Sequence, residues 1–131
     1  DIARQRCPEC AFVQRDIRDP GLVLESFDGV FACASLIHIA PAELPKVLTG
    51  IHSLLKPEGC LAAIIQDGEG VHEKYSSLEF GGRKYNRTLY LYTGEALGEV
   101  ADRAGFVFIR DGFLDPSLTE QRWRNYIFRR R

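Results

Sequence analysis

Two sets of side chains in this sequence have the types and spacing needed for chemistry. Cys7 and Cys10 have CxxC spacing, which could provide half of a metal site or a redox pair. A structural zinc ion needs about four ligands, and no second CxxC or HxxxH follows, so two reduced thiols are the simpler interpretation. His38 stands between Ile37 and Ile39. Its imidazole could take a proton from a nucleophile, or it could be a hydrogen-bonded structural group.

The bulk composition excludes several classes of function. The 131 residues are 45% hydrophobic with a formal net charge of −1, which suits one globular domain and not a nucleic-acid-binding protein. The apolar runs end well before the roughly 18 residues needed to span a bilayer, and no secretory signal opens the chain. We therefore expect a cytoplasmic protein, with neither nucleic acid nor membrane as partner. Its other two cysteines, Cys33 and Cys60, lie in apolar runs, where free cysteine behaves as a small hydrophobe.

Hydrophobic patterning predicts the elements that would position these groups. The near-continuous apolar stretches at 27–39 and 60–65 are typical of strands that are covered on both faces of a parallel sheet. Between them, a helical repeat starting at Pro41 predicts a helix that runs to Leu55. Strand, helix and strand together form a βαβ unit. The segment Ala11–Arg15 is predicted as a further strand.

Capping residues and apolar segments in the second half of the chain predict one more helix and two strands, which follow a long irregular stretch. Thr93 is a suitable N-cap for the helix and Gly105 a suitable C-terminal cap. Segments 106–109 and 123–128 are predicted as final strands, joined as antiparallel neighbours. The stretch 67–92 shows no regular pattern, and loops of this length in compact domains are usually functional lids or partly disordered.

The 67–92 stretch carries side chains that could cover and bind an acceptor molecule. Arginine and tyrosine together can hold a carboxylate or a phosphate, although a solvated surface loop is the plainer alternative. We predict substrate contacts by Tyr85 and Arg87. Other candidates in the stretch are Tyr75, Arg83, Lys84 and Tyr90. At the far end of the chain, Arg129–Arg131 are expected to be a solvated terminus, although three cations could steer an anionic partner.

These segments, taken in order, resemble the class I S-adenosylmethionine-dependent methyltransferases. The resemblance rests on FDGV at 27–30, SLIHI at 35–39, LLKPEGCL at 54–61, YTGEAL at 92–97 and AGF at 104–106. It implies an α/β, Rossmann-like fold with a mostly parallel sheet, helices on both faces and an antiparallel last strand. It also implies that residues 1–131 are a single, N-terminally truncated methyltransferase-like domain. The two N-terminal strands and the glycine-rich turn that grips the cofactor would lie upstream of Asp1.

The resemblance also implies a site for S-adenosylmethionine. Asp16 and Ile17 match the positions that border the adenine ring. Ala34, Ser35 and Leu36 match the wall beneath the methionine part of the cofactor, at the carboxyl end of a strand, where open α/β sheets bind ligands. For Asp16 the alternative is a plain turn acid between two arginines.

The implied activity is methyl transfer from S-adenosylmethionine to a small-molecule acceptor, as part of a longer parent chain. The reaction is an in-line displacement at a sulfonium, so the protein's main tasks are positioning and desolvation. His38 is the candidate catalytic residue, because the resemblance places it near the methyl group; no metal is expected. This chain alone is expected to be inactive. The alternative is a non-catalytic truncated module that binds a partner, or forms a homodimer, through an exposed sheet edge.

Overall fold

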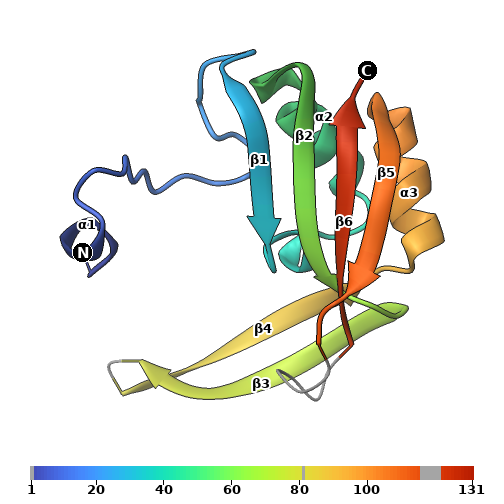
Figure 1. Ribbon diagram of the computed structural model, residues 1–131. Helices are drawn as coiled ribbons and strands as arrows, with labels where there is room; N and C mark the ends of the chain where they lie inside the picture. Colours follow the sequence, from blue (N-terminus) through green and yellow to red (C-terminus); the bar gives the residue numbers. More distant parts are fainter. Residues whose placement is uncertain (1, 81, 116–121) are drawn as a thin grey trace.

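A four-stranded sheet forms the centre of the molecule in the computed structural model, which describes residues 2–80, 82–115 and 122–131 (Figure 1). Its strands stand in the order β1-β2-β6-β5. A separate two-stranded sheet, β3-β4, projects from one end of the main sheet. The main sheet contains β1 (Phe27–Cys33), β2 (Leu55–Gln66), β5 (Phe106–Phe113) and β6 (Trp123–Arg130).

Strands β1 and β2 are parallel and are joined by helix α2 (Leu44–Leu54), which confirms the predicted strand-helix-strand unit. The apolar stripe of α2 is buried, as its helical spacing predicts. The helix begins later than predicted, because the Ala40 carbonyl first accepts a hydrogen bond from the Glu43 N–H and closes a turn. Pro45 therefore occupies the first turn of the helix in place of Pro41.

Strand β6 runs antiparallel to both of its neighbours, β2 and β5. The other three strands therefore point the same way, which confirms the antiparallel last strand of a mostly parallel α/β sheet. Both β5 and β6 extend further than predicted, to Phe113 and Arg130. The register between them shifts from Phe108 to Arg110, a β-bulge that leaves Ile109 outside the pairing.

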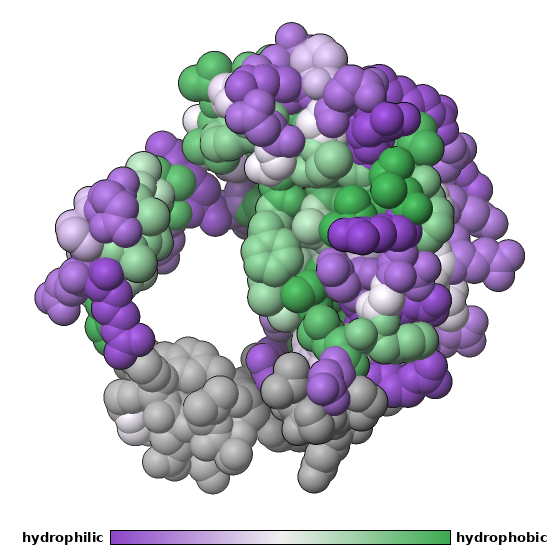
Figure 2. Space-filling view, viewed as in Figure 1, coloured by the Kyte–Doolittle hydropathy of each residue, from purple (hydrophilic) through white to green (hydrophobic). Residues whose placement is uncertain are grey.

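Helices α2 and α3 (Gly94–Arg103) contact each other and pack on one face of the sheet (Figure 1). The β2 residues on that face are fully buried: Leu61, Ala63 and Ile65. On the opposite face Phe31, Cys33 and Cys60 are exposed, so the two cysteines do not pack as small hydrophobes as expected. Figure 2 shows apolar residues over the sheet on its uncovered side. The short helix α1 (Ile2–Arg6) lies apart from the sheet, so the described helices cover one face where the resemblance implied two.

The segment Ala11–Arg15, predicted as a strand, does not form one. An isolated bridge between Asp16 and Asp19 is the nearest strand-like pairing in the described part of the chain. A strand needs a neighbour to satisfy its backbone N–H and C=O groups. None of the described strands lies beside this segment, which runs clear of the sheet (Figure 1).

The stretch 67–92, predicted to be irregular, forms a hairpin. Its strands β3 (Gly70–Phe80) and β4 (Arg83–Leu91) are antiparallel, with Gly70 opposite Leu91 at the base. Two glycines between two strand-forming runs are a known hairpin signal, and the sequence has Gly81 followed by Gly82 at this point. That local signal, rather than the mixed composition of the stretch, predicts the structure correctly.

Tyr92 fastens the base of this hairpin to the turn that follows β1. Its hydroxyl donates a 2.5 Å hydrogen bond to the Ile39 carbonyl, and its side chain is buried. The bond lies next to the 3₁₀ turn η1 (Leu36–His38), against which β4 packs. Burial raises the pKa of Tyr92 to about 12, with a further contribution from Tyr90. The phenol is therefore a protonated donor over the whole neutral range.

The C-terminal arginines are bound to the fold, whereas we expected a solvated terminus. Arg130 is mostly buried and donates hydrogen bonds to the Leu55 carbonyl and the Glu25 carboxylate. The other two pairs are Arg129 with Glu58 and Arg131 with Asp102. The last residues of the chain therefore close the end of the sheet at which β2 begins, and their charges are neutralised by specific carboxylates.

We expect Gly105 to resist substitution and Gly98 to benefit from it. Gly105 has a φ of +93°, and a Cβ there would lie 2.8 Å from His52 Nε2. At Gly98, inside α3, a Cβ would meet nothing within 4 Å. Gly105→Ala should lower the free energy of unfolding by about 2 kcal/mol through strain and overlap. Gly98→Ala should raise it by about 1 kcal/mol through helix propensity. Urea denaturation measures both, and a Gly105→Ala protein of unchanged stability would contradict this packing.

Replacing Tyr92 by Phe should destabilise the protein and change its response to high pH. The Ile39 carbonyl would lose its donor, which should cost about 1–3 kcal/mol at neutral pH. In the unsubstituted protein the Tyr92 phenol has a pKa near 10 when the chain is unfolded and near 12 when it is folded. The free energy of unfolding should therefore fall as the pH rises between these values. The Tyr92→Phe variant should lose less stability over that range. The loss that remains should come from Tyr126, whose pKa is also raised by burial.

Denaturation curves recorded from pH 8 to 11 on the unsubstituted protein and on Tyr92→Phe test this pH dependence. The matched control is Tyr90→Phe, which removes a neighbouring, half-buried hydroxyl and should change the stability by less than about 0.5 kcal/mol. Equal effects of the two substitutions would show that the bond to Ile39 is not what holds the hairpin.

Candidate functional site

Strand β1 ends in a backbone conformation that is rare for alanine. Ala34 has a φ of 49°, yet its N–H still donates to the Ile64 carbonyl of β2 at 3.0 Å. A strained residue of this kind persists only where its surroundings fix it, and such residues cluster at ligand sites. Ser35 follows and begins the η1 turn. Because open α/β sheets bind ligands beyond the carboxyl ends of their strands, the carboxyl end of β1 is a candidate ligand site.

A network of charged side chains holds the turn that contains Asp16 against the start of α2. The Arg18 backbone N–H donates to Asp16 Oδ1 at 2.9 Å. The Arg18 guanidinium then pairs with Asp16 Oδ2 at 3.0 Å and with Glu43 Oε1 at 2.8 Å. The bond from the Arg18 N–H is the main reason why the pKa of Asp16 is lowered, with the guanidinium adding to it. Asp16 is therefore an exposed, ionised acceptor whose position is set by Arg18.

A pocket of about 320 Å³ lies between this turn, β1 and α2. Two of the predicted cofactor residues, Ile17 and Ser35, line it together, although 18 positions separate them in the sequence. The rest of its lining is mostly apolar: it includes Pro20 and Leu22, runs along β1 from Phe27 to Ala32, and reaches Ile51 and Leu54 at the end of α2. Sequence reasoning missed these residues. The one available signal was the apolar run that follows Pro20 and Gly21.

The structure places the other predicted cofactor residues around this pocket in different ways. Ala34 is half-buried and packs against the core beside Ser35. Leu36 is fully buried in the core, so only its backbone is available to a ligand. Asp16 adjoins Ile17, but its carboxylate is turned to Arg18 and is not part of the lining.

His38 ends the η1 turn with an exposed side chain. Its backbone N–H donates to the Ser35 carbonyl at 3.1 Å, which ties it to the residue that lines the pocket. Because the imidazole is exposed, it is not a packed core histidine and is accessible to a proton donor or acceptor in solution. Its position depends on η1, which Tyr92 fixes from the other side through Ile39.

The predicted substrate residues lie on β4 of the hairpin. Arg87 is exposed and stands opposite Lys74 of β3, and no described contact joins it to the pocket. The side chain of Tyr85 lies outside the part of the structure that is described. Closer to the base, Leu89 is buried against the core. The hairpin therefore leaves the core next to η1, and its base borders the candidate site.

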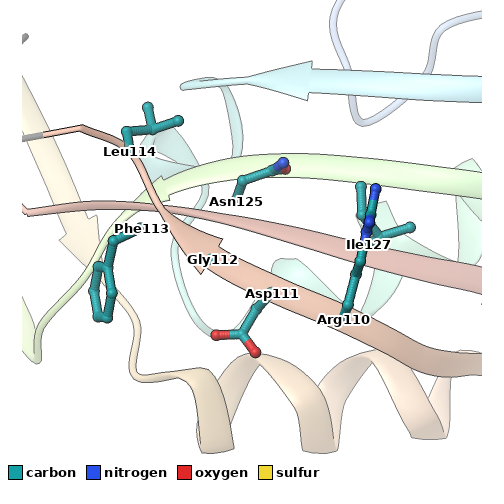
Figure 3. Close-up of a pocket in the computed structure, with 7 residues that line it drawn as sticks. All are labelled: Arg110, Asp111, Gly112, Phe113, Leu114, Asn125 and Ile127. Atoms are coloured by element: carbon teal, nitrogen blue, oxygen red, sulfur yellow. The ribbon is translucent and has the colours of Figure 1, made fainter.

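A second hollow, of about 240 Å³, lies at the other edge of the sheet and contains none of the predicted residues (Figure 3). In Figure 3, Arg110 and Asp111 project from β5 in different directions, so the hollow wraps around the strand edge. The Asp111 carboxylate is already paired with Arg124. The pocket at the end of β1 is therefore the better candidate for a ligand site.

Metal binding and membrane insertion each need a recognisable arrangement of residues, and neither arrangement occurs among the described residues. No group of three or more His, Cys, Asp or Glu side chains among them could hold a metal ion. Within the same residues, no helix is both long and apolar enough to cross a membrane. The β1 pocket itself presents an apolar surface, with the Ser35 hydroxyl in its lining and the Asp16 carboxylate and His38 imidazole nearby in the sequence.

Sequence comparison connects the chain to methyltransferases. A family model described as a methyltransferase domain matches residues 1–59. An uncharacterized methyltransferase of Synechocystis sp. is 28% identical over 109 residues, which are 82% of this chain and 51% of the relative. The chain thus spans about half the length of the curated relative it matches.

Solved structures show the same fold. The 1,6-didemethyltoxoflavin-N1-methyltransferase of Burkholderia thailandensis, solved with 1,6-didemethyltoxoflavin and S-adenosylhomocysteine bound, has a TM-score of 0.76 at 20% identity over 98% of this chain and 55% of that one. An S-adenosylmethionine-dependent methyltransferase of Methanosarcina mazei has a TM-score of 0.73 at 14% identity over 88% of this chain and 65% of that one. Sequence match and shared fold together support a class I S-adenosylmethionine-dependent methyltransferase as the kind of protein that this chain resembles.

Proposed function

We propose that the longer protein containing this chain is a cytoplasmic enzyme that transfers a methyl group from S-adenosylmethionine to a small-molecule acceptor. The observation that carries the proposal is the shared pocket of Ile17 and Ser35. Two segments that match separate parts of a cofactor site in the family meet at one hollow, which runs along β1 and has Ser35 at the carboxyl end of that strand. That is where the physics of open α/β sheets favours a ligand.

The residues of the pocket suit the adenine side of the cofactor. A flat heteroaromatic ring gains from apolar walls, which Ile17, Leu22 and Phe31 provide. Asp16, held ionised by Arg18, can accept a hydrogen bond from an exocyclic amine at the pocket's border. The sequence contains no GxGxxG or GxGxG, so these residues form one side of a cofactor cleft.

The bound cofactor would supply an electrophilic methyl group on a sulfonium. The tasks left to this chain are to orient the two reactants and to exclude water. His38, exposed beyond Ser35, is placed to remove a proton from the acceptor, while the hairpin base held by Tyr92 forms the neighbouring wall. The Burkholderia relative, which binds a small heteroaromatic acceptor, supports a small molecule as the substrate class.

Calorimetric titration with S-adenosylhomocysteine tests the pocket directly. As one side of a cleft, the chain should bind with a Kd on the order of 0.1–1 mM. Ile17→Asp should weaken binding at least tenfold (about 1.4 kcal/mol), because it puts a charge against the ring. Val13→Asp is the matched control: Val13 is 63% exposed in the same segment, and its replacement should leave affinity unchanged. Absence of heat at millimolar ligand, or an Ile17→Asp protein that binds normally, would remove the pocket from the cofactor site.

A specific observation favours the second candidate function, self-association through an exposed edge. Strand β1 stands at the edge of the sheet, and its Phe31 is 64% exposed. The strand contains neither lysine nor proline, the residues that commonly protect edges from pairing. Its one charged residue, Asp28, is neutralised by Lys56 at 2.8 Å. We therefore propose a homodimer formed by edge-to-edge contact of two β1 strands.

Sedimentation equilibrium distinguishes this candidate from a monomer. The unsubstituted chain should dimerise as its concentration rises, and Phe31→Lys should shift the equilibrium toward monomer by at least tenfold, because a charge on an edge disfavours pairing. Phe108→Lys provides the control, since Phe108 is 52% exposed on the opposite edge strand, β5. A monomer at every concentration would eliminate the homodimer. Because Phe31 also lines the pocket, the two candidates use the same strand, and the cofactor site is tested separately by the titration of Ile17→Asp.

A further inference from the structure

Cys7 and Cys10 stand at the two ends of a closed four-residue turn. The Cys10 backbone N–H donates to the Cys7 carbonyl at 3.1 Å. A turn closed in this way brings its first and last Cα atoms to within about 7 Å. Disulfides form over Cα separations of about 4.4–6.8 Å. The backbone of the reduced chain therefore already holds the two cysteines near bonding range.

The residue after Cys7 favours the same geometry. Pro8 occupies the second position of the turn, where its ring sets the backbone angle that the turn needs. The turn is also fixed on both flanks, because Arg4 of α1 donates a 2.8 Å hydrogen bond to the Phe12 carbonyl across it. Little additional chain entropy is lost when the two sulfurs are joined.

Both thiols are free and accessible. Cys10 is exposed and Cys7 half-exposed. The turn stands well away from the sheet (Figure 1), so a small solute can approach it without disturbing the core. Thiol exchange requires this access as well as a partner sulfur within reach.

The other two cysteines lack a partner sulfur within reach. Cys33 of β1 stands opposite Ile64 of β2, whereas Cys60 stands opposite Gly29. Four residues along a strand separate the two thiols by roughly 13 Å, which is too far for a bond. Cys33 and Cys60 are exposed, so they act as internal controls for thiols that are reactive but not paired.

A metal ion is a weaker explanation for the pair. Zinc takes about four protein ligands in a structural site. Among the described residues no third His, Cys, Asp or Glu joins these two thiols in a cluster. Two ligands in an exposed turn leave most of a coordination shell to water, while the same two thiols are sufficient for a disulfide.

We propose that Cys7 and Cys10 form a reversible dithiol–disulfide site that is oxidised by low-molecular-weight disulfides such as glutathione disulfide. The exposed Cys10 thiolate attacks the small disulfide, which forms a mixed disulfide and releases one glutathione thiolate. The Cys7 thiolate then attacks the Cys10 sulfur, closes the ring and releases the second glutathione. Two protein thiols lose two protons and two electrons, and one small disulfide becomes two thiols. This site is independent of the proposed methyl transfer.

Peptide mapping after incubation with glutathione disulfide tests the proposal. Trypsin cuts after Arg6 and Arg15, so residues 7–15 form one peptide that contains both cysteines. The expected product is this peptide lighter by two hydrogen atoms and without glutathione, restored to the reduced mass by dithiothreitol. Cys33 and Cys60 should each carry one glutathione or remain reduced.

Two variants make the result decisive. In Cys7→Ser the ring cannot close, so Cys10 should accumulate as the mixed disulfide. In Pro8→Gly the turn is less constrained, so the internal disulfide should decrease relative to mixed disulfide. A 7–15 peptide with two glutathiones would overturn the proposal. So would a 7–15 peptide that stays reduced while Cys33 and Cys60 react, or one that zinc protects from glutathione disulfide at equimolar concentration.

Discussion

The parallel pairing of β1 with β2 is the constraint on which the candidate site depends. Parallel strands need a crossover, and α2 provides it by burying its apolar stripe against the sheet. The pairing continues to the very end of β1, where the Ala34 N–H still reaches the Ile64 carbonyl. Ala34, which makes this last bond, adopts a left-handed conformation, and the chain turns there into η1. Ser35 and His38 thereby come to stand at the carboxyl end of the sheet.

Different interactions stabilise the two ends of the sheet. At the end where β2 begins, Arg130 reaches the Leu55 carbonyl and the Glu25 carboxylate and closes the structure. At the opposite end, the buried Tyr92 phenol fixes the hairpin to Ile39. Paired charges occur at both ends, because the Arg18 network lies at the second. The second end also has exposed polar groups beside an apolar pocket. Binding chemistry is therefore concentrated at the second end.

Sequence patterns predict the elements whose structure is determined by residues close together in the chain. The α2 stripe and the Thr93 cap, whose hydroxyl accepts from the Ala96 N–H, follow from residues within one or two turns. Patterns fail where a distant partner decides the outcome. Ala11–Arg15 has the composition of a strand but no described neighbour. The Tyr92 bond joins residues 53 positions apart, and the pocket draws on Pro20 and Phe31 as well as Ile17. Only the family resemblance selected Ile17 and Ser35 before the structure brought them together.

The hollow along β1 is proposed as the adenosine side of a cofactor cleft. Amide NMR spectra of the isotope-labelled chain, recorded while adenosine is added, test it most directly. We expect concentration-dependent shifts at Ile17, Ala34, Ser35 and His38, with the amides of α3 unchanged. Shifts confined to the hollow at the β5 edge, or none up to millimolar adenosine, would contradict it.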